Sequence, residues 1–106
     1  MLKVISFYYD GGVVMLYKKN GNKVLSDELF KSPTSEYRGA PFWSWNTKIE
    51  KELIEEQILH MKEMGFGGFH IHSRTGLDTP YLGDEFMDMV KHANEFGKDN
   101  DMLTWL

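Results

Sequence analysis

The spacing of hydrophobic and polar residues along 34–106 predicts strands and helices in alternation. Apolar residues between positions 49 and 64 recur at steps of three and four, which is the period of one face of an α-helix. A second stretch with this period begins near Asp84. Short apolar and aromatic runs of strand length flank the two helices, at 40–46, 67–73 and 102–106. The predicted order is therefore strand, helix, strand, helix, strand.

The ends and buried faces of the two helices can also be predicted. Thr47 followed by Glu50 matches a capping box, so we expect Thr47 to cap the first helix. Gly65 is expected in the left-handed conformation that ends this helix, with Phe66 folding back onto the last turn. The spacing in the second helix predicts a buried face made by Phe86, Met89, Val90, Ala93 and Phe96.

Strands that alternate with helices at this spacing predict an α/β fold with parallel strands, because successive strands joined by a helix pack side by side. We expect residues 32–106 to form a partial TIM barrel, namely its first β-α-β-α-β units. A complete barrel repeats the unit eight times over about 250 residues, so we expect this chain to be truncated after its third strand. A small open α/β sheet is the alternative fold.

Residues 1–31 follow a different pattern, and we expect them to form a separate N-terminal extension. The runs 4–9 and 13–17 are rich in β-branched and aromatic residues, and Asp-Gly-Gly at 10–12 separates them. Such runs on either side of a turn predict a β-hairpin. A further run at 23–25 would extend the hairpin into a short three-stranded meander.

Composition and charge remove several functional classes. The chain of 106 residues has no cysteine, which excludes disulfides and thiolate metal sites. Its net charge is −4 at pH 7, which argues against a nucleic-acid partner. No apolar run approaches the ~20 residues needed to span a bilayer. No signal peptide is visible either, so we expect no membrane partner and assign no compartment.

The carboxyl ends of the predicted strands are where a ligand is expected to bind in this type of fold. That rule selects Trp45 and Asn46 after the first strand, His72 and Arg74 after the second, and Asp78 in the following loop. Tryptophan faces stack on sugar rings, and asparagine, histidine and arginine hydrogen-bond to hydroxyls or to a carboxylate. These five residues therefore predict a carbohydrate pocket, although Trp45 could instead pack in the core. Glycoside hydrolysis needs two carboxylates across the scissile bond, and no complete pair is found, so the catalytic residues stay unassigned.

His70 and His72 require separate consideration because they share one face of the second predicted strand. Two histidines in this arrangement can bind a metal together, which makes a metal-dependent hydrolase an alternative function. The sequence offers no certain carboxylate partner, and we assign no metal ligand. A role in the pocket without metal is expected for His72, and a place in the barrel interior for His70.

Three runs in the chain carry a family resemblance: SEYRGAPFWSWN at 35–46, MGFGGF at 64–69 and HSRTGLDTPYL at 72–82. In order and spacing they resemble the start of the alpha-L-rhamnosidase-like glycoside hydrolases. The resemblance implies a TIM-barrel catalytic core and hydrolysis of terminal rhamnose, or a related sugar, from polysaccharide. It also implies a bacterial enzyme of a type that is often secreted or periplasmic. The resemblance further implies that some full-length relatives use calcium, but no ligand for it is assignable here.

The resemblance also implies what this chain lacks. In the family the catalytic carboxylates fall after the third strand, where this sequence stops. We therefore expect residues 32–106 to be the N-terminal part of a glycoside hydrolase domain, contributing part of the sugar pocket and inactive alone. Its partners would be a carbohydrate substrate and the remainder of the barrel. A small non-catalytic α/β module that binds carbohydrate or a partner is the alternative.

Overall fold

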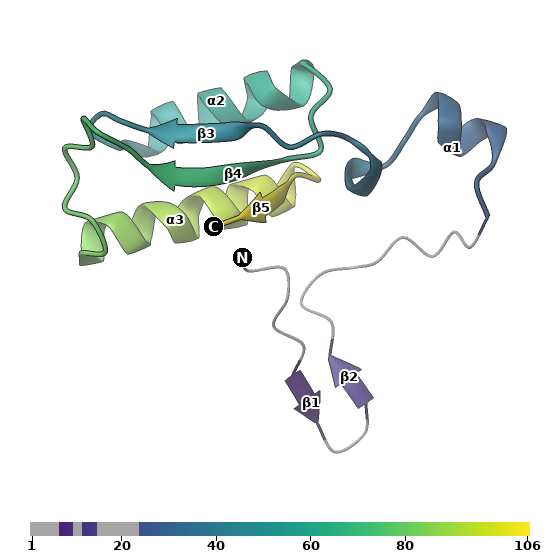
Figure 1. The fold of residues 1–106 in the computed structure, drawn as a ribbon, viewed down its shortest axis with the longest axis horizontal. Coiled ribbons are helices and arrows are strands. Elements are labelled where there is room, and N and C mark those ends of the chain that lie inside the picture. The colour runs from purple at the N-terminus through teal and green to yellow at the C-terminus, as the bar shows by residue number, and fades with distance from the viewer. Residues whose placement is uncertain (1–6, 10–11, 15–23) are drawn as a thin grey trace.

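The computed structural model describes residues 7–9, 12–14 and 24–106. These form a hairpin, short helical segments, and a three-stranded sheet with two longer helices (Figure 1). The elements are β1 (Phe7–Tyr9), β2 (Gly12–Val14), α1 (Asp27–Lys31), the 3₁₀ helix η2 (Ser35–Tyr37), β3 (Phe42–Trp45), α2 (Lys51–Glu63), β4 (Gly68–Ser73), α3 (Asp84–Asp99) and β5 (Leu103–Trp105).

The sheet is parallel and has the order β3-β4-β5, with β4 in the centre. In its register Trp43 lies beside Ile71, and Phe69 lies beside Thr104. The predicted α/β class and the order of strands and helices are therefore confirmed. The barrel itself stays a prediction, because three strands in a row do not close.

One face of the sheet is covered by α2 and α3, which lie side by side (Figure 1). Side chains alternate between the faces of a strand, so every second residue of β3 and β4 enters the core between sheet and helices. The buried apolar side chains of these four elements are Trp43, Trp45, Phe69 and Ile71 from the strands and Ile54, Ile58, Met61, Phe86, Val90 and Ala93 from the helices. Of the five residues predicted to be buried on α3, three are in this set, and Met89 and Phe96 pack against it while partly exposed.

Aromatic rings meet edge to face at the centre of this core. Trp45 is 2% exposed, and its ring centroid lies 5.6 Å from those of both Trp43 and Phe86. Trp43 also contacts Phe69 at 5.0 Å, and its indole N–H donates a hydrogen bond of 2.6 Å to Gln57 Oε1. Each such ring pair adds about 0.5–1.5 kcal/mol to the free energy of burial. The core is therefore stabilised by specific ring contacts as well as by the burial of apolar surface area.

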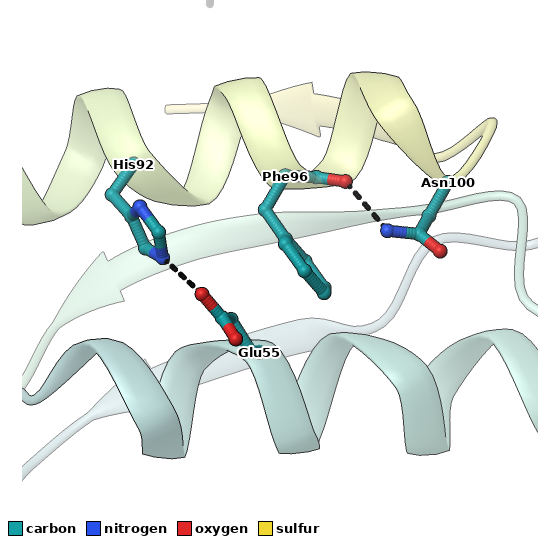
Figure 2. Close-up of polar contacts among 4 residues, drawn as sticks. All are labelled: Glu55, His92, Phe96 and Asn100. Atoms are coloured by element: carbon teal, nitrogen blue, oxygen red, sulfur yellow. Dashed lines mark hydrogen bonds and ion pairs between the residues drawn. The ribbon is translucent and has the colours of Figure 1, made fainter.

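A polar contact at the edge of the core joins the two helices. His92 Nε2 on α3 lies 2.9 Å from Glu55 Oε1 on α2, and the two side chains point toward one another between the helices (Figure 2). Directly after α3, the side-chain amide of Asn100 donates to the carbonyl oxygen of Phe96 at 2.9 Å (Figure 2). Because both partners of the His92–Glu55 pair are part-exposed, such a contact contributes at most about 1 kcal/mol. The apolar faces dominate the packing of the helices.

Both long helices end in the same way. Gly65 after α2 has φ +89°, and the amides of Gly65 and Phe66 donate to Lys62 O and Met61 O, each at 3.0 Å. This hydrogen-bond pattern is the Schellman motif, so the predicted end of the first helix is confirmed. After α3 the left-handed position is held by Asp101 with φ +58°, and the amide of Met102 donates to Gly97 O at 2.8 Å.

The predicted start of the first helix is wrong. Glu50, not Thr47, precedes α2, and it makes no side-chain capping bond. Instead, Thr47 O accepts the amide of Asp78 at 3.2 Å, and the amide of Ile49 donates to Thr79 Oγ1 at 3.0 Å. The segment that was predicted to form a capping box is therefore hydrogen-bonded to the distant loop between β4 and α3.

The N-terminal prediction is met where the structure describes it. β1 and β2 pair antiparallel with Tyr9 beside Gly12, so the hairpin is confirmed there, and the rest of 4–9 and 13–17 lies outside the described residues. Val24 and Leu25 belong to no strand, so they do not extend the hairpin into a meander. The helix α1 was not predicted. The Ser26 hydroxyl caps it by accepting the amide of Leu29 at 3.1 Å.

The buried face of α2 gives a direct test of this packing. Ile58 is 0% exposed, whereas its neighbour Leu59 is 41% exposed. Ile58→Ala should lower the free energy of unfolding by about 2–5 kcal/mol, because it leaves a cavity in the core. The matched control Leu59→Ala should cost less than about 1 kcal/mol. Urea unfolding followed by circular dichroism measures both, and equal losses would contradict the orientation of α2.

Candidate functional site

A cleft of about 770 Å³ opens where β4 and β5 end. Its walls come from the end of β4, the loop between β4 and α3, the first turns of α3, and the residue after β5. The lining residues are Ile71, His72, Ser73, Arg74, Leu77, Asp78, Thr79, Pro80, Tyr81, Leu82, Phe86, Met87, Val90 and Leu106. Its size lies within the ~300–1,000 Å³ of small-molecule sites, and it lies at the carboxyl ends of parallel strands, where such folds bind ligands.

The structure brings three of the five predicted pocket residues to this cleft. His72 is the last residue but one of β4, Arg74 follows the strand, and Asp78 lies in the loop beyond it. Asn46 is exposed at the end of β3 but is not among the lining residues; its carbonyl oxygen lies against Gly76, where an added Cβ would be 2.7 Å away.

Trp45 differs from the pocket prediction. Its ring lies on the helix-covered side of β3 and is enclosed by Trp43 and Phe86, with 2% of the residue exposed. A sugar cannot stack on this ring in the observed structure. The alternative role, packing in the core, is the one that the structure gives to Trp45.

The β4–α3 loop is fixed by its own backbone and by the segment before α2. The amide of Leu77 donates to Arg74 O at 3.1 Å, and Gly76 adopts φ +100°, which favours glycine. Thr79 is 3% exposed, and its hydroxyl accepts the amide of Ile49. The cleft wall is therefore a fixed loop, tied at Asp78 and Thr79 to residues 47–49.

The open face of the sheet carries a row of stacked rings. Phe42 and His72 are 4.1 Å apart with planes at 19°, and His70 and Trp105 are 5.0 Å apart with planes at 18°. His70 and His72 link the two pairs at 6.3 Å and 29°. Gly68 makes room for the indole, because a Cβ there would lie 2.4 Å from Trp105. Since the rings turn their faces toward one another, they present edges, and not a flat platform, to a ligand.

Arg74 extends this row at its cleft end. Its guanidinium carbon lies 4.9 Å from the centroid of Phe42, a cation–π distance. Phe42 is 51% exposed. Its ring contacts two groups that line the cleft, the Arg74 guanidinium and the His72 ring.

The metal alternative gains no further ligand from the part of the chain that the structure describes. No group of three histidine, cysteine, aspartate or glutamate side chains there is placed to hold a metal ion. Each ring is stacked on an aromatic neighbour, His70 on Trp105 and His72 on Phe42, and the two histidine rings are 6.3 Å apart between their centroids. Chelation by this pair would require both rings to leave their aromatic neighbours.

Tyr81 is the main lining residue for which the sequence suggested no role. It is 65% exposed, and its ring contacts Phe86 edge to face at 5.3 Å. Leu82, Met87 and Leu106 add exposed apolar surface to the same cleft. An aromatic residue in the loop after a strand was the available signal, but only the folded loop shows that it faces a cavity.

Comparison of the chain with protein-family models, curated proteins and solved structures gives no match. In the described residues, neither α2, α3 nor the shorter helices have the length and apolar character of a membrane span. A functional assignment therefore has to come from the residues and geometry of the cleft.

The tie between the loop and α2 can be tested at Thr79. Thr79→Val keeps the shape of the side chain but leaves the buried amide of Ile49 without an acceptor, which should cost about 1–3 kcal/mol of unfolding free energy. Exchange of the Ile49 amide with deuterium should also become faster. Thr75→Val, at an exposed position of the same loop, is the control and should change neither quantity. Unchanged exchange at Ile49 in Thr79→Val would show that this bond does not hold the loop.

Proposed function

We propose that this chain forms the first strand–helix units of a glycoside hydrolase barrel related to the alpha-L-rhamnosidase-like enzymes, and that the cleft is part of its sugar subsite. The observation that carries the proposal is the cleft at the carboxyl ends of the parallel strands. It gathers His72, Arg74 and Asp78, which the sequence had selected by their positions after the second strand. All three lie in the 72–82 run that resembles the family.

The arrangement of the sheet supports the barrel. In a TIM barrel the helices cover the outer face of the strands, and the inner face is filled by side chains from other strands. Here α2 and α3 cover one face. The opposite face presents the partly exposed residues Phe42, His70 and Trp105, which a closed barrel would enclose.

The chemistry of the cleft suits a sugar. Tyr81 offers an exposed aromatic ring for the apolar face of a pyranose, and Leu82 and Met87 extend that surface. Asp78 can accept hydrogen bonds from hydroxyls, while Arg74 and His72 can donate them. Among the described lining residues, Asp78 carries the carboxylate, whereas glycoside hydrolysis uses two. We therefore expect this chain to bind sugar without cleaving it.

Titration of the chain with L-rhamnose, followed by NMR shifts of backbone amides, tests the subsite. Residues 72–82 should show the largest shifts. Tyr81→Ala should weaken binding about tenfold, which corresponds to the ~1.4 kcal/mol that one aromatic contact contributes. Tyr37→Ala, at an exposed tyrosine outside the cleft, should leave affinity unchanged.

Two results would contradict the proposal. One is rhamnose binding with shifts confined to residues outside the cleft, and the other is an equal effect of Tyr81→Ala and Tyr37→Ala. Incubation with an aryl α-L-rhamnoside should give no turnover by this chain. Turnover would contradict the expectation that the chain does not cleave sugar. If that turnover persisted in Asp78→Asn, catalysis would not depend on the cleft carboxylate.

A small non-catalytic α/β binding module is the second candidate, and the closed core favours it. Trp45, Ile58 and Phe69 are almost fully buried between the sheet and the two helices, so the described residues already enclose a core. Such a module should be monomeric by sedimentation equilibrium and unfold in one cooperative transition. Self-association through the open face or the sheet edges would instead favour the barrel, because parallel edges left unpaired recruit further strands.

A further inference from the structure

We propose that His72 and Arg74, both supported by the ring of Phe42, form a carboxylate-binding pair, so that the ligand of the cleft is an acidic sugar. The inference rests on the proposed function, since it assumes that the cleft takes a sugar. It adds the charge of that sugar and a positioning role for Phe42.

The geometry places the two groups against one support. The His72 ring is stacked on Phe42 with centroids 4.1 Å apart and planes at 19°. The Arg74 guanidinium lies 4.9 Å from the centroid of the same ring. Both side chains line the cleft. Both donors therefore lie against the Phe42 ring, at the end of the cleft where β4 ends.

Neither group has an acidic partner in the described part of the chain. An ion pair between His92 and Glu55 joins the two helices, away from the cleft lining. The contacts that the structure gives to Arg74 and His72 are with ring faces and leave their N–H groups for a ligand. In a chain with a net charge of −4, an arginine that lines a cleft and makes no ion pair there is a candidate for binding an anionic ligand.

The support matters because it orients the donors before the ligand arrives. Guanidinium is planar and binds a carboxylate through two parallel N–H bonds. Stacking on Phe42 restricts the rotamers of Arg74 and His72, and this reduces the entropy lost on binding. The nitrogens of His72 lie on the ring edge, outside the stack.

The rest of the cleft narrows the class of anion. Tyr81 and Leu82 provide an apolar wall for a ring, which a small inorganic anion would not use. The Asp78 carboxylate accepts hydrogen bonds from hydroxyls, and it would repel a second carboxylate on the ligand. A sugar ring with one carboxylate, such as a hexuronate, satisfies all of these groups.

The test compares three probes on the 106-residue chain by calorimetry: D-galacturonate, D-galactose and acetate. Galacturonate should bind at least ~10-fold more tightly than galactose, as expected for hydrogen bonds between charged groups. It should also bind more tightly than acetate. Arg74→Gln should lower galacturonate affinity more than galactose affinity, and so remove the preference for galacturonate. Lys91→Gln removes a positive charge from an exposed site on α3 outside the cleft lining, and it should preserve the preference.

Phe42 is tested as a positioning residue by Phe42→Leu, which keeps every charge but removes the ring. Galacturonate affinity should fall more than galactose affinity, and circular dichroism should confirm an intact fold. Phe30→Leu, at an exposed phenylalanine in α1, is the matched control.

The outcomes separate this inference from the proposed function. Equal binding of galactose and galacturonate in the cleft would overturn the carboxylate pair and leave the sugar subsite standing. Acetate binding as tight as galacturonate would show a simple anion site and overturn the acidic sugar. Binding of none of the three probes, nor of L-rhamnose, would overturn both.

Discussion

The packing of Trp45 and Phe69 against α2 and α3 is the contact on which the other features depend. Because side chains alternate along a strand, burial of Trp43 and Trp45 turns Phe42 and Ser44 to the opposite face of β3. Burial of Phe69 and Ile71 turns His70 and His72 the same way on β4. A shift of one residue in either strand would exchange these sets. The core thus determines which rings can stack on the open face.

Two independent supports then build the cleft. Its loop is held by two hydrogen bonds to residues 47–49 before α2, one from the Asp78 amide and one to the Thr79 hydroxyl. Its polar side chains are held by a ring, since Phe42 lies against both His72 and Arg74. The loop sets the shape of the cavity, and the ring sets the direction of the donors. Both supports begin in β3 or just after it, although the lining residues all lie between Ile71 and Leu106.

The structure changes the chemical picture of the site in one respect. The pocket was expected to offer tryptophan faces, but Trp45 is buried and the rings on the open face are stacked on one another. The exposed aromatic ring of the cleft is that of Tyr81. The site therefore combines one ring, an apolar wall and a cationic end, and the proposal of an acidic sugar follows from that combination.

Local pattern was sufficient for those features that depend on near neighbours in the chain. The strand–helix order, the left-handed Gly65 and the opposite faces of Phe69 and His70 all follow from residue spacing. The helix α1 could not be predicted from hydrophobic spacing. It has five residues, of which Leu29 is the buried one, and a single buried residue defines no period. His72, Arg74 and Asp78 could be selected because strand ends and loops are visible in the sequence.

The tertiary structure decided what depends on contacts between distant segments. Thr47 is not the helix cap, and its segment is bonded instead to the loop that bears Thr79, 30 residues beyond Ile49. Trp45 could lie at the rim or in the core, and only its contact with Phe86 on α3 placed it in the core. The pairing of His72 and Arg74 on Phe42 needs two strands in register. Sequence spacing specifies periodicity within one element, but it does not specify which distant side chain will occupy the neighbouring space.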